Sequence, residues 1–166
     1  MTIADFILSN NTGDDSFVEP FIIAEAGVNH ECSMTLARRL IDEAAFAGAN
    51  AIKFQTYKAS TIASVNSPAY WDLSKEGTKS QYELFKKYDK FWKSEFELLH
   101  KYCDEVGIEF LSTPFDIESA KFLNNLMSAF KISSSDLNNK PFIEHLCSYG
   151  KPIILSTGAS FMWEIE

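Results

Sequence analysis

Residues 21–57 read FIIAEAGVNHECSMTLARRLIDEAAFAGANAIKFQTY, and this stretch decides the fold. Its apolar run at 21–26 predicts a buried strand, and the run at 51–57 predicts a second one. Between them, residues 33–48 place apolar side chains at helical spacing behind Ser33, a residue type that caps helices. The residues expected on the buried face of this helix are Leu36, Leu40, Ala44 and Ala47. Strand, helix and strand in this order predict one unit of a parallel sheet.

The same alternation continues toward the C-terminus. Further strands are predicted at 109–113, 130–134 and 152–157, and further helices at 93–106, 116–127, 140–149 and from 160 onward. Because no GxGxxG follows the first strand, a dinucleotide-binding fold is disfavoured. A complete TIM barrel needs about 250 residues, and this chain has 166. We therefore predict an α/β fold that is the N-terminal part, about five βα units, of a truncated TIM (β/α)8 barrel.

Two segments lie outside this alternation. Residues 1–20 are predicted to be a polar lead-in with a turn cluster, NNTGDD, at 10–15, which leaves 21–166 as the partial TIM-barrel domain. Residues 58–92 combine aromatic side chains with many charges and predict a surface helical insertion. Such a segment could be a lid over a substrate or an interface, and the sequence leaves both open.

Composition and charge exclude several classes of protein. The chain has 15 basic and 23 acidic residues, a net charge of −8, and so lacks the basic footprint of a nucleic-acid binder. No run of about 18 apolar residues predicts a membrane span, and the polar, acidic start does not resemble a secretory signal. The three cysteines are widely spaced, which fits reduced thiols. We expect a cytoplasmic protein with neither nucleic-acid nor membrane partners.

Polar side chains recur where the predicted strands end, which is where barrel enzymes build their active sites. The polar residues at the five strand ends are Glu25, Asn29 and His30, then Lys53 and Gln55, then Ser112 and Thr113, then Lys131 with Ser133, Ser134 and Ser135, and last Ser156 and Thr157. Lys53 and Gln55 are two positions apart on one strand and therefore share a face. Two lysines and several hydroxyl donors suit the phosphate and carboxylate of a doubly anionic small molecule. Serine and threonine at strand ends also cap the following helix, so each hydroxyl has a structural alternative.

At these residues the chain resembles the N-acetylneuraminate (sialic acid) synthase family, which includes the legionaminic and pseudaminic acid synthases of bacterial surface glycans. The strings that carry the resemblance are FIIAEAGVNH at 21–30, AIKFQTYKA at 51–59, FLSTPFD at 110–116, FKISSSDLNN at 130–139 and KPIILSTGAS at 151–160. They occur in the family's order over most of the chain.

The resemblance implies a transferase that forms a carbon–carbon bond. Family enzymes condense phosphoenolpyruvate with an open-chain N-acyl aminosugar such as N-acetylmannosamine, giving a nonulosonic acid and phosphate for capsule or lipopolysaccharide carbohydrate. A divalent metal, Mn²⁺ or Mg²⁺, takes part, and the enzymes are homodimers. The family's two metal-binding histidines come from later barrel strands, and its antifreeze-like domain follows the barrel. We therefore expect no metal ligands in this chain, and no synthase activity from it alone.

Residue by residue, the resemblance implies catalytic roles for Glu25, near the reacting centre, and Lys53, on phosphoenolpyruvate. Gln55 would contact the aminosugar. The residues expected to hold the phosphate and carboxylate of phosphoenolpyruvate are Thr113, Lys131, Ser134 and Ser156. Asn29 and His30 would shape the first loop.

Other functions remain open at this point. Lys53 or Lys131 could form a Schiff base in a class I aldolase. The chain resembles synthases of phosphorylated keto-sugars more distantly. A non-catalytic half barrel could instead serve as a binding or assembly module, covering its open strand edges.

Overall fold

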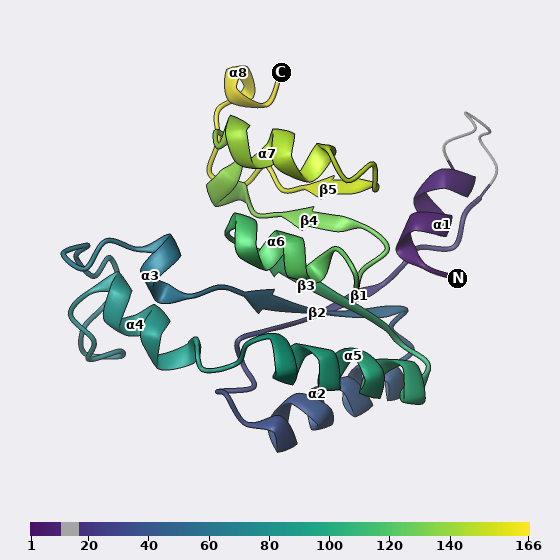
Figure 1. Cartoon of the computed structure of the whole chain (residues 1–166), viewed down its shortest axis with the longest axis horizontal. Helices are drawn as coiled ribbons and strands as arrows, with labels where there is room; N and C mark the ends of the chain where they lie inside the picture. Colours follow the sequence, from purple (N-terminus) through teal and green to yellow (C-terminus); the bar gives the residue numbers. More distant parts are fainter. Residues whose placement is uncertain (11–16) are drawn as a thin grey trace.

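The computed structural model of the chain describes residues 1–10 and 17–166, and it is built on two short parallel sheets (Figure 1). The first sheet has the order β1-β2-β3, and the second pairs β4 with β5. The strands are β1 (Ile23–Gly27), β2 (Ala51–Thr56), β3 (Glu109–Pro114), β4 (Phe130–Ile132) and β5 (Ile153–Leu155). Strand β4 lies in contact with β3, although no ladder pairs them in the described residues. The predicted parallel α/β arrangement is confirmed.

Three of the five helices that follow the described strands begin with a side-chain cap. The five are α2 (Met34–Phe46), α5 (Lys93–Val106), α6 (Ile117–Leu123), α7 (Lys140–Cys147) and α8 (Met162–Ile165), and the capped ones are α2, α6 and α7. Ser33 caps α2, and the Asp116 carboxylate accepts a hydrogen bond from the Ser119 N–H at 2.7 Å at the start of α6. Helices α2 and α5 pack against each other on one face of the first sheet (Figure 1). None of the described helices is long and apolar enough to cross a bilayer.

The buried face of α2 differs from the prediction. Ala37, Ile41 and Ala44 are buried, whereas Leu36 is 40% exposed and Ala47 is also exposed. A helix that packs on both a sheet and a neighbouring helix presents a wide apolar stripe. Of the four predicted residues, Ala44 is buried and Leu40 is partly buried, while the other two lie toward solvent.

The stretch that the sequence analysis described as a polar lead-in, 1–20, contains a helix that it did not predict. Helix α1 (Ile3–Ser9) begins at Thr2, whose hydroxyl accepts a hydrogen bond from the Asp5 N–H. Ile3 is buried, and its N–H donates to the Glu109 carboxylate at 2.7 Å. A helix of seven residues is too short for its periodicity to stand out, and its contact with Glu109 joins positions 106 residues apart. The turn cluster predicted at 10–15 lies, apart from its first residue, outside the described residues.

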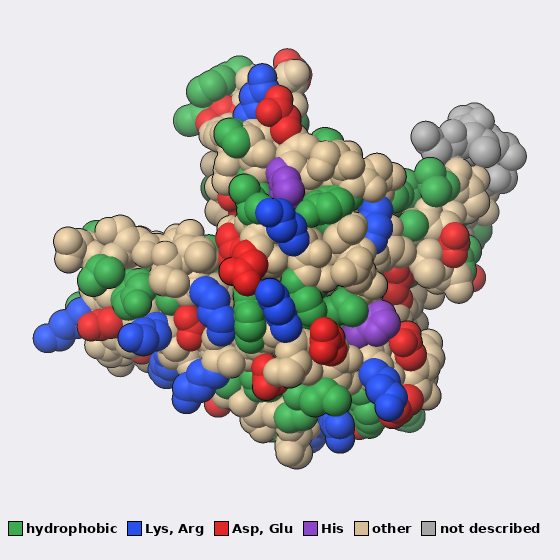
Figure 2. All heavy atoms as spheres, in the orientation of Figure 1, with side chains coloured by type: hydrophobic (Ala, Val, Ile, Leu, Met, Phe, Trp, Pro, Cys, Tyr) green, Lys and Arg blue, Asp and Glu red, His purple; other side chains and the backbone are tan. Residues whose placement is uncertain are grey.

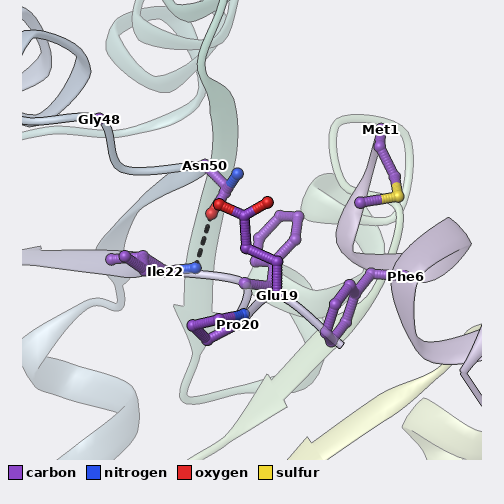
Figure 3. A pocket seen from close by; sticks show the side chains of 8 residues that line it. Met1, Phe6, Glu19, Pro20, Ile22, Gly48 and Asn50 are labelled. Carbon is purple, nitrogen blue, oxygen red and sulfur yellow. Dashed lines mark hydrogen bonds between the residues drawn. The ribbon is translucent and has the colours of Figure 1, made fainter. Parts of the chain in front are cut away.

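A small pocket separates α1 from the start of β1 (Figure 3). Phe6 and Phe21 lie along it, with ring centroids 5.4 Å apart. Beside it the Ile22 N–H donates to Asn50 Oδ1 at 2.7 Å, which ties the residues before β1 to those before β2 (Figure 3). The pocket therefore lies at the amino ends of the strands, the end that serves stability in barrel proteins.

The predicted surface insertion at 58–92 is confirmed as helical and exposed. It contains α3 (Ala59–Ile62) and α4 (Gln81–Tyr88), and α4 has no buried residue. The segment projects to one side of the sheet, and basic side chains gather over that part of the molecule (Figures 1 and 2). It is anchored at its base, because Lys58 Nζ donates to the Asp89 carbonyl at 2.5 Å and the Ala59 N–H donates to the Asp89 carboxylate at 2.9 Å.

Candidate functional site

The first group of polar side chains lies on one face of the β1-β2-β3 sheet. Glu25 is the register partner of Lys53, and Gln55 is the register partner of Thr113. Register partners in a parallel ladder point to the same side, and residues two apart on a strand share a face. Four of the predicted site residues therefore project from the same side of three adjacent strands.

An ion pair joins the first two of these residues. Lys53 Nζ donates to Glu25 Oε2, and the lysine side chain is 12% exposed whereas the glutamate side chain is 52% exposed. A pair this open to water adds little to stability. The ion pair instead positions a side chain, because the Glu25 carboxylate holds the Lys53 ammonium group at the carboxyl end of β2.

Gly27 brings Gln55 next to this pair. A Cβ atom at Gly27 would lie 3.4 Å from Glu25 Oε1 and 3.5 Å from Gln55 Nε2. The residue has φ +54°, a backbone conformation that favours glycine, and the ladder register shifts between Glu25 and Gly27. Such irregularities re-aim side chains near active sites. The local backbone thus places a carboxylate, an ammonium and an amide side by side.

The second group centres on Lys131 in β4. Its Nζ donates to Ser156 Oγ at 2.6 Å and to the Ile132 carbonyl at 2.7 Å. Burial lowers the pKa of Lys131, the positive charge of Lys53 lowers it further, and the Glu25 carboxylate acts in the opposite direction. Charge coupling to both residues shows that the two groups share one electrostatic environment. Two ammonium groups in such a place favour a ligand with more than one negative charge.

Ser134 and Thr113 are the remaining candidate site residues, and they lie in different surroundings. Ser134 opens a short 3₁₀ turn (Ser134–Asp136) after β4, and a Cβ atom at Gly158 would lie 3.5 Å from its Oγ. The Ser134 hydroxyl therefore faces the loop that follows β5. Thr113 is 4% exposed on the face of Gln55. Its neighbour Ser112 points to the other face and pairs with the buried Thr56 hydroxyl at 2.7 Å, so it stays out of the site.

His30, His100 and His145 do not form a cluster. His100 lies 3.5 Å from Asp104 on α5, and His145 Nε2 lies 3.1 Å from the Tyr149 hydroxyl. His30 is buried in the loop after β1. Within residues 1–10 and 17–166, no group of three His, Cys, Asp or Glu side chains could hold a metal ion. The described residues do not fit a metal centre.

One residue named in the sequence analysis lies away from the site, and one residue that it did not name anchors the neighbouring segment. Asn29 is exposed and lines a groove with residues of α2, so the structure does not bring it to the cluster. Sequence reasoning missed Lys58, whose contacts with Asp89 and Phe91 fix the base of the 58–92 segment. The partners lie 31 and 33 residues away, and no local pattern signals contacts at that distance.

The chain resembles known proteins over most of its length. A profile of the NeuB family matches residues 40–166. The N,N'-diacetyllegionaminic acid synthase of Campylobacter jejuni is 40% identical over 148 residues, which are 87% of this chain and 44% of that protein. Human N-acetylneuraminate-9-phosphate synthase is 32% identical over 143 residues, or 86% of this chain and 40% of that protein. The chain thus spans less than half the length of these relatives.

Solved structures agree with the sequence comparison. The N-acetylneuraminic acid synthetase of Leptospira borgpetersenii, solved in complex with citrate, superimposes with a TM-score of 0.75 at 39% identity, covering 87% of this chain and 47% of that one. A 3-deoxy-D-arabino-heptulosonate 7-phosphate synthase of Thermotoga maritima superimposes with a TM-score of 0.59 at 13% identity, a likeness of fold alone. The five strands described here are therefore part of a TIM barrel, and the chain belongs to the NeuB family.

Proposed function

We propose that this chain carries the phosphoenolpyruvate-binding part of a sialic-acid-type synthase. The enzyme would condense phosphoenolpyruvate with an open-chain N-acyl aminosugar, such as N-acetylmannosamine, to a nonulosonic acid and phosphate. The observation that carries the proposal is that the charge of Lys53 acts on Lys131, whose ammonium donates to Ser156 Oγ at 2.6 Å. Relatives named legionaminic, pseudaminic and N-acetylneuraminate-9-phosphate synthases support the substrate class.

Each candidate residue has a role that its chemistry allows. The ammonium groups of Lys53 and Lys131 bind the phosphate and carboxylate of phosphoenolpyruvate, since both are anions. Hydroxyl donors of Thr113, Ser134 and Ser156 supply further hydrogen bonds to those oxygens. The amide of Gln55, beside Glu25, binds the polar groups of the aminosugar.

The reaction balances without any redox step. C3 of phosphoenolpyruvate attacks the sugar aldehyde carbon, and the aldehyde oxygen takes up a proton to become a hydroxyl. The cation left at C2 adds water, which loses a proton. The C2–O bond to phosphate then breaks, the C2 hydroxyl loses its proton, and the ketone forms. In this proposal the Glu25 carboxylate accepts the proton of the attacking water.

The remaining expectations belong to the same proposal. We propose that the enzyme uses a divalent metal, Mn²⁺ or Mg²⁺, held by ligands outside this chain, and acts as a homodimer in the cytoplasm. A metal would polarise the sugar aldehyde and lower the pKa of bound water. A role in bacterial capsule or lipopolysaccharide biosynthesis is supported by a relative named as a spore coat polysaccharide biosynthesis protein, 36% identical over 166 residues.

The test follows phosphate release from phosphoenolpyruvate with Mn²⁺ and a panel of N-acyl aminosugars. It is run on this chain and on a longer polypeptide that adds the part of the Campylobacter relative beyond the matched region. We expect release from the longer polypeptide only, and only with an aminosugar present. No release with any aminosugar, from a folded longer polypeptide, would contradict the proposal.

One observation favours a second function, a class I aldolase. The lowered pKa of Lys131 would leave more of its amine neutral and able to attack a ketone. The amine adds to the carbonyl of pyruvate, water leaves, and borohydride reduces the imine to a stable secondary amine. A covalent pyruvate adduct on Lys131 after borohydride treatment would support the aldolase, and an unmodified Lys131 would exclude it.

A further inference from the structure

His30 is a buried residue that the proposed reaction does not use. Its imidazole lies in the loop between β1 and α2 and is 1% exposed. One ring face stacks on Phe91, with 4.5 Å between centroids and 12° between planes. A tilted contact of 5.9 Å joins the ring to Phe54. The polar ring is therefore enclosed by aromatic side chains from two other parts of the chain.

The hydrogen bonds of His30 define its protonation state. Nδ1 accepts from the Cys32 N–H at 3.1 Å, so in the neutral ring the proton is assigned to Nε2. Nε2 is buried with no hydrogen-bond partner among the residues that the structure describes. Burial lowers the pKa of His30 to about 4, which makes the neutral form the working form near pH 7. Protonation of Nδ1 would remove the acceptor that Cys32 uses.

The loop that His30 holds has an unusual backbone. Glu31 and Cys32 have φ of 49° and 58°, two successive non-glycine residues in the left-handed region. This conformation is strained for residues with a side chain and persists where the surroundings hold it. The Cys32 N–H, fixed by His30, lies in this strained turn.

The second element that His30 contacts is the base of the 58–92 segment. Phe91, stacked on the ring, closes that segment, and its carbonyl accepts a hydrogen bond from Lys58 Nζ at 3.3 Å. Phe54, the other aromatic neighbour, stands on β2 between Lys53 and Gln55, with its side chain on the opposite face. The His30 ring thus contacts both β2, which carries Lys53 and Gln55, and the 58–92 segment, which follows β2.

We propose that His30 is a positioning residue, whose neutral imidazole clamps the β1–α2 loop to the base of the 58–92 segment and so fixes the aminosugar side of the site. The inference rests on the proposed function, in which Gln55 binds the aminosugar. His30 backs the β1–β2 end of the cluster, where Gln55 lies. The phosphoenolpyruvate groups of β4 and β5, Lys131 and Ser156, have no contact with it.

Three substitutions separate the two contacts of the ring. His30→Asn keeps an acceptor for the Cys32 N–H but loses the stack, His30→Phe keeps the stack but loses the acceptor, and His30→Ala loses both. His145→Phe, on α7, is the matched control. In the longer polypeptide we expect His30→Phe and His30→Ala to raise the aminosugar KM on the order of tenfold. The KM for phosphoenolpyruvate should change less, because Lys131 and Ser156 bind it from strands that His30 does not contact, and His30→Asn should recover part of the loss.

Equal changes in both KM values would overturn the proposal, as would His30→Asn behaving like His30→Ala. A spectroscopic measurement on this chain keeps the clamp testable without any reaction. Nitrogen NMR should show a neutral His30 with its proton on Nε2 at pH 6, and the Cys32 amide should exchange slowly in wild type and fast in His30→Phe. A ring that titrates near pH 6.5, beside a fast-exchanging amide, would refute the clamp. If the Cys32 amide exchanges slowly but the longer polypeptide condenses no aminosugar, the clamp is supported and the proposed function is contradicted.

Discussion

At the scale of single residues, Lys131 makes the proposed binding of phosphoenolpyruvate sensitive to alkaline pH. Burial and the charge of Lys53 lower the pKa of Lys131 below its ordinary value of 10.5. As the pH rises through that lowered pKa, the ammonium loses its proton and its charge. We expect the affinity for phosphoenolpyruvate to fall at a pH below 10.5, earlier than an ordinary lysine would cause, by roughly ten- to a hundredfold once the charge is lost.

Calorimetric titrations at increasing pH would measure the effect. Lys131→Arg is the matched variant, because a guanidinium keeps its charge throughout. Its affinity should be flat where that of the wild type falls. An equal decline in both proteins would show that another group is responsible.

His30 links the stability of the fold to acidic pH. Its pKa is about 4 in the folded protein, against an ordinary value of 6.5, so the unfolded chain binds more protons between these values. The stabilisation is present above about pH 6.5 and is lost as the pH falls toward 4, and the full shift corresponds to roughly 3 kcal/mol.

Urea unfolding at pH 7.5 and pH 4.5 would test this link. Acidic groups also lose stabilising contacts over this range, so the comparison with His30→Asn isolates the histidine. We expect a smaller loss of unfolding free energy in the variant than in the wild type. Identical pH slopes would argue against a buried, neutral His30.

At the scale of elements, the Glu109 carboxylate links helix α1 to β3 and to the residues before β4. Glu109 accepts hydrogen bonds from the Ile3 N–H at 2.7 Å and from the Ser128 hydroxyl at 2.5 Å. Glu109→Ala should lower the free energy of unfolding by about 2 kcal/mol, since it leaves both donors without their acceptor. Glu105→Ala, at an exposed position of α5, should change it by less than about 0.5 kcal/mol.

Chemical denaturation of the two variants, with phosphoenolpyruvate binding as a second measurement, would check this prediction. Binding should be intact in Glu109→Ala, because the α1 contact lies at the amino end of β3. A variant as stable as the wild type would mean that the helix is held by its apolar contacts alone.

The elements also show what the sequence could and could not predict. Apolar runs such as 51–57 and the cap residue Ser33 located strands and a helix, because both signals are local. Helix α1 was missed because its stabilising contact, with Glu109, is distant in sequence. The inward face of α2 was misplaced because periodicity alone does not reveal that a second helix packs beside it.

The candidate site was predictable to a similar extent. Strand-end position and residue type sufficed to select Lys53, Lys131 and Ser156, because the carboxyl ends of parallel strands meet at one edge. The Lys131–Ser156 contact and the clamp at His30 required coordinates, since each joins separate elements. The roles of these residues in binding remain predictions until they are measured.

At the scale of the whole molecule, a protein with a net charge of −8 brings two partly buried ammonium groups, Lys53 and Lys131, near enough for one charge to act on the other. A protein acidic overall repels anions at long range, so binding of a doubly negative ligand has to come from this local arrangement. Glu25 offsets part of the charge of Lys53, whereas Lys131 is held by neutral oxygens. The two ammonium groups can therefore bind a further negatively charged group.

Titration calorimetry of this chain with phosphoenolpyruvate tests the central claim most directly. We expect one binding site, with affinity weakened at least about tenfold by Lys53→Met and by Lys131→Met, because each removes a charge-assisted hydrogen bond. Lys121→Met, at an exposed position of α6, should bind as the wild type does. A folded wild-type chain without binding at millimolar phosphoenolpyruvate, or lysine variants that bind as tightly as the wild type, would contradict the assignment of this site.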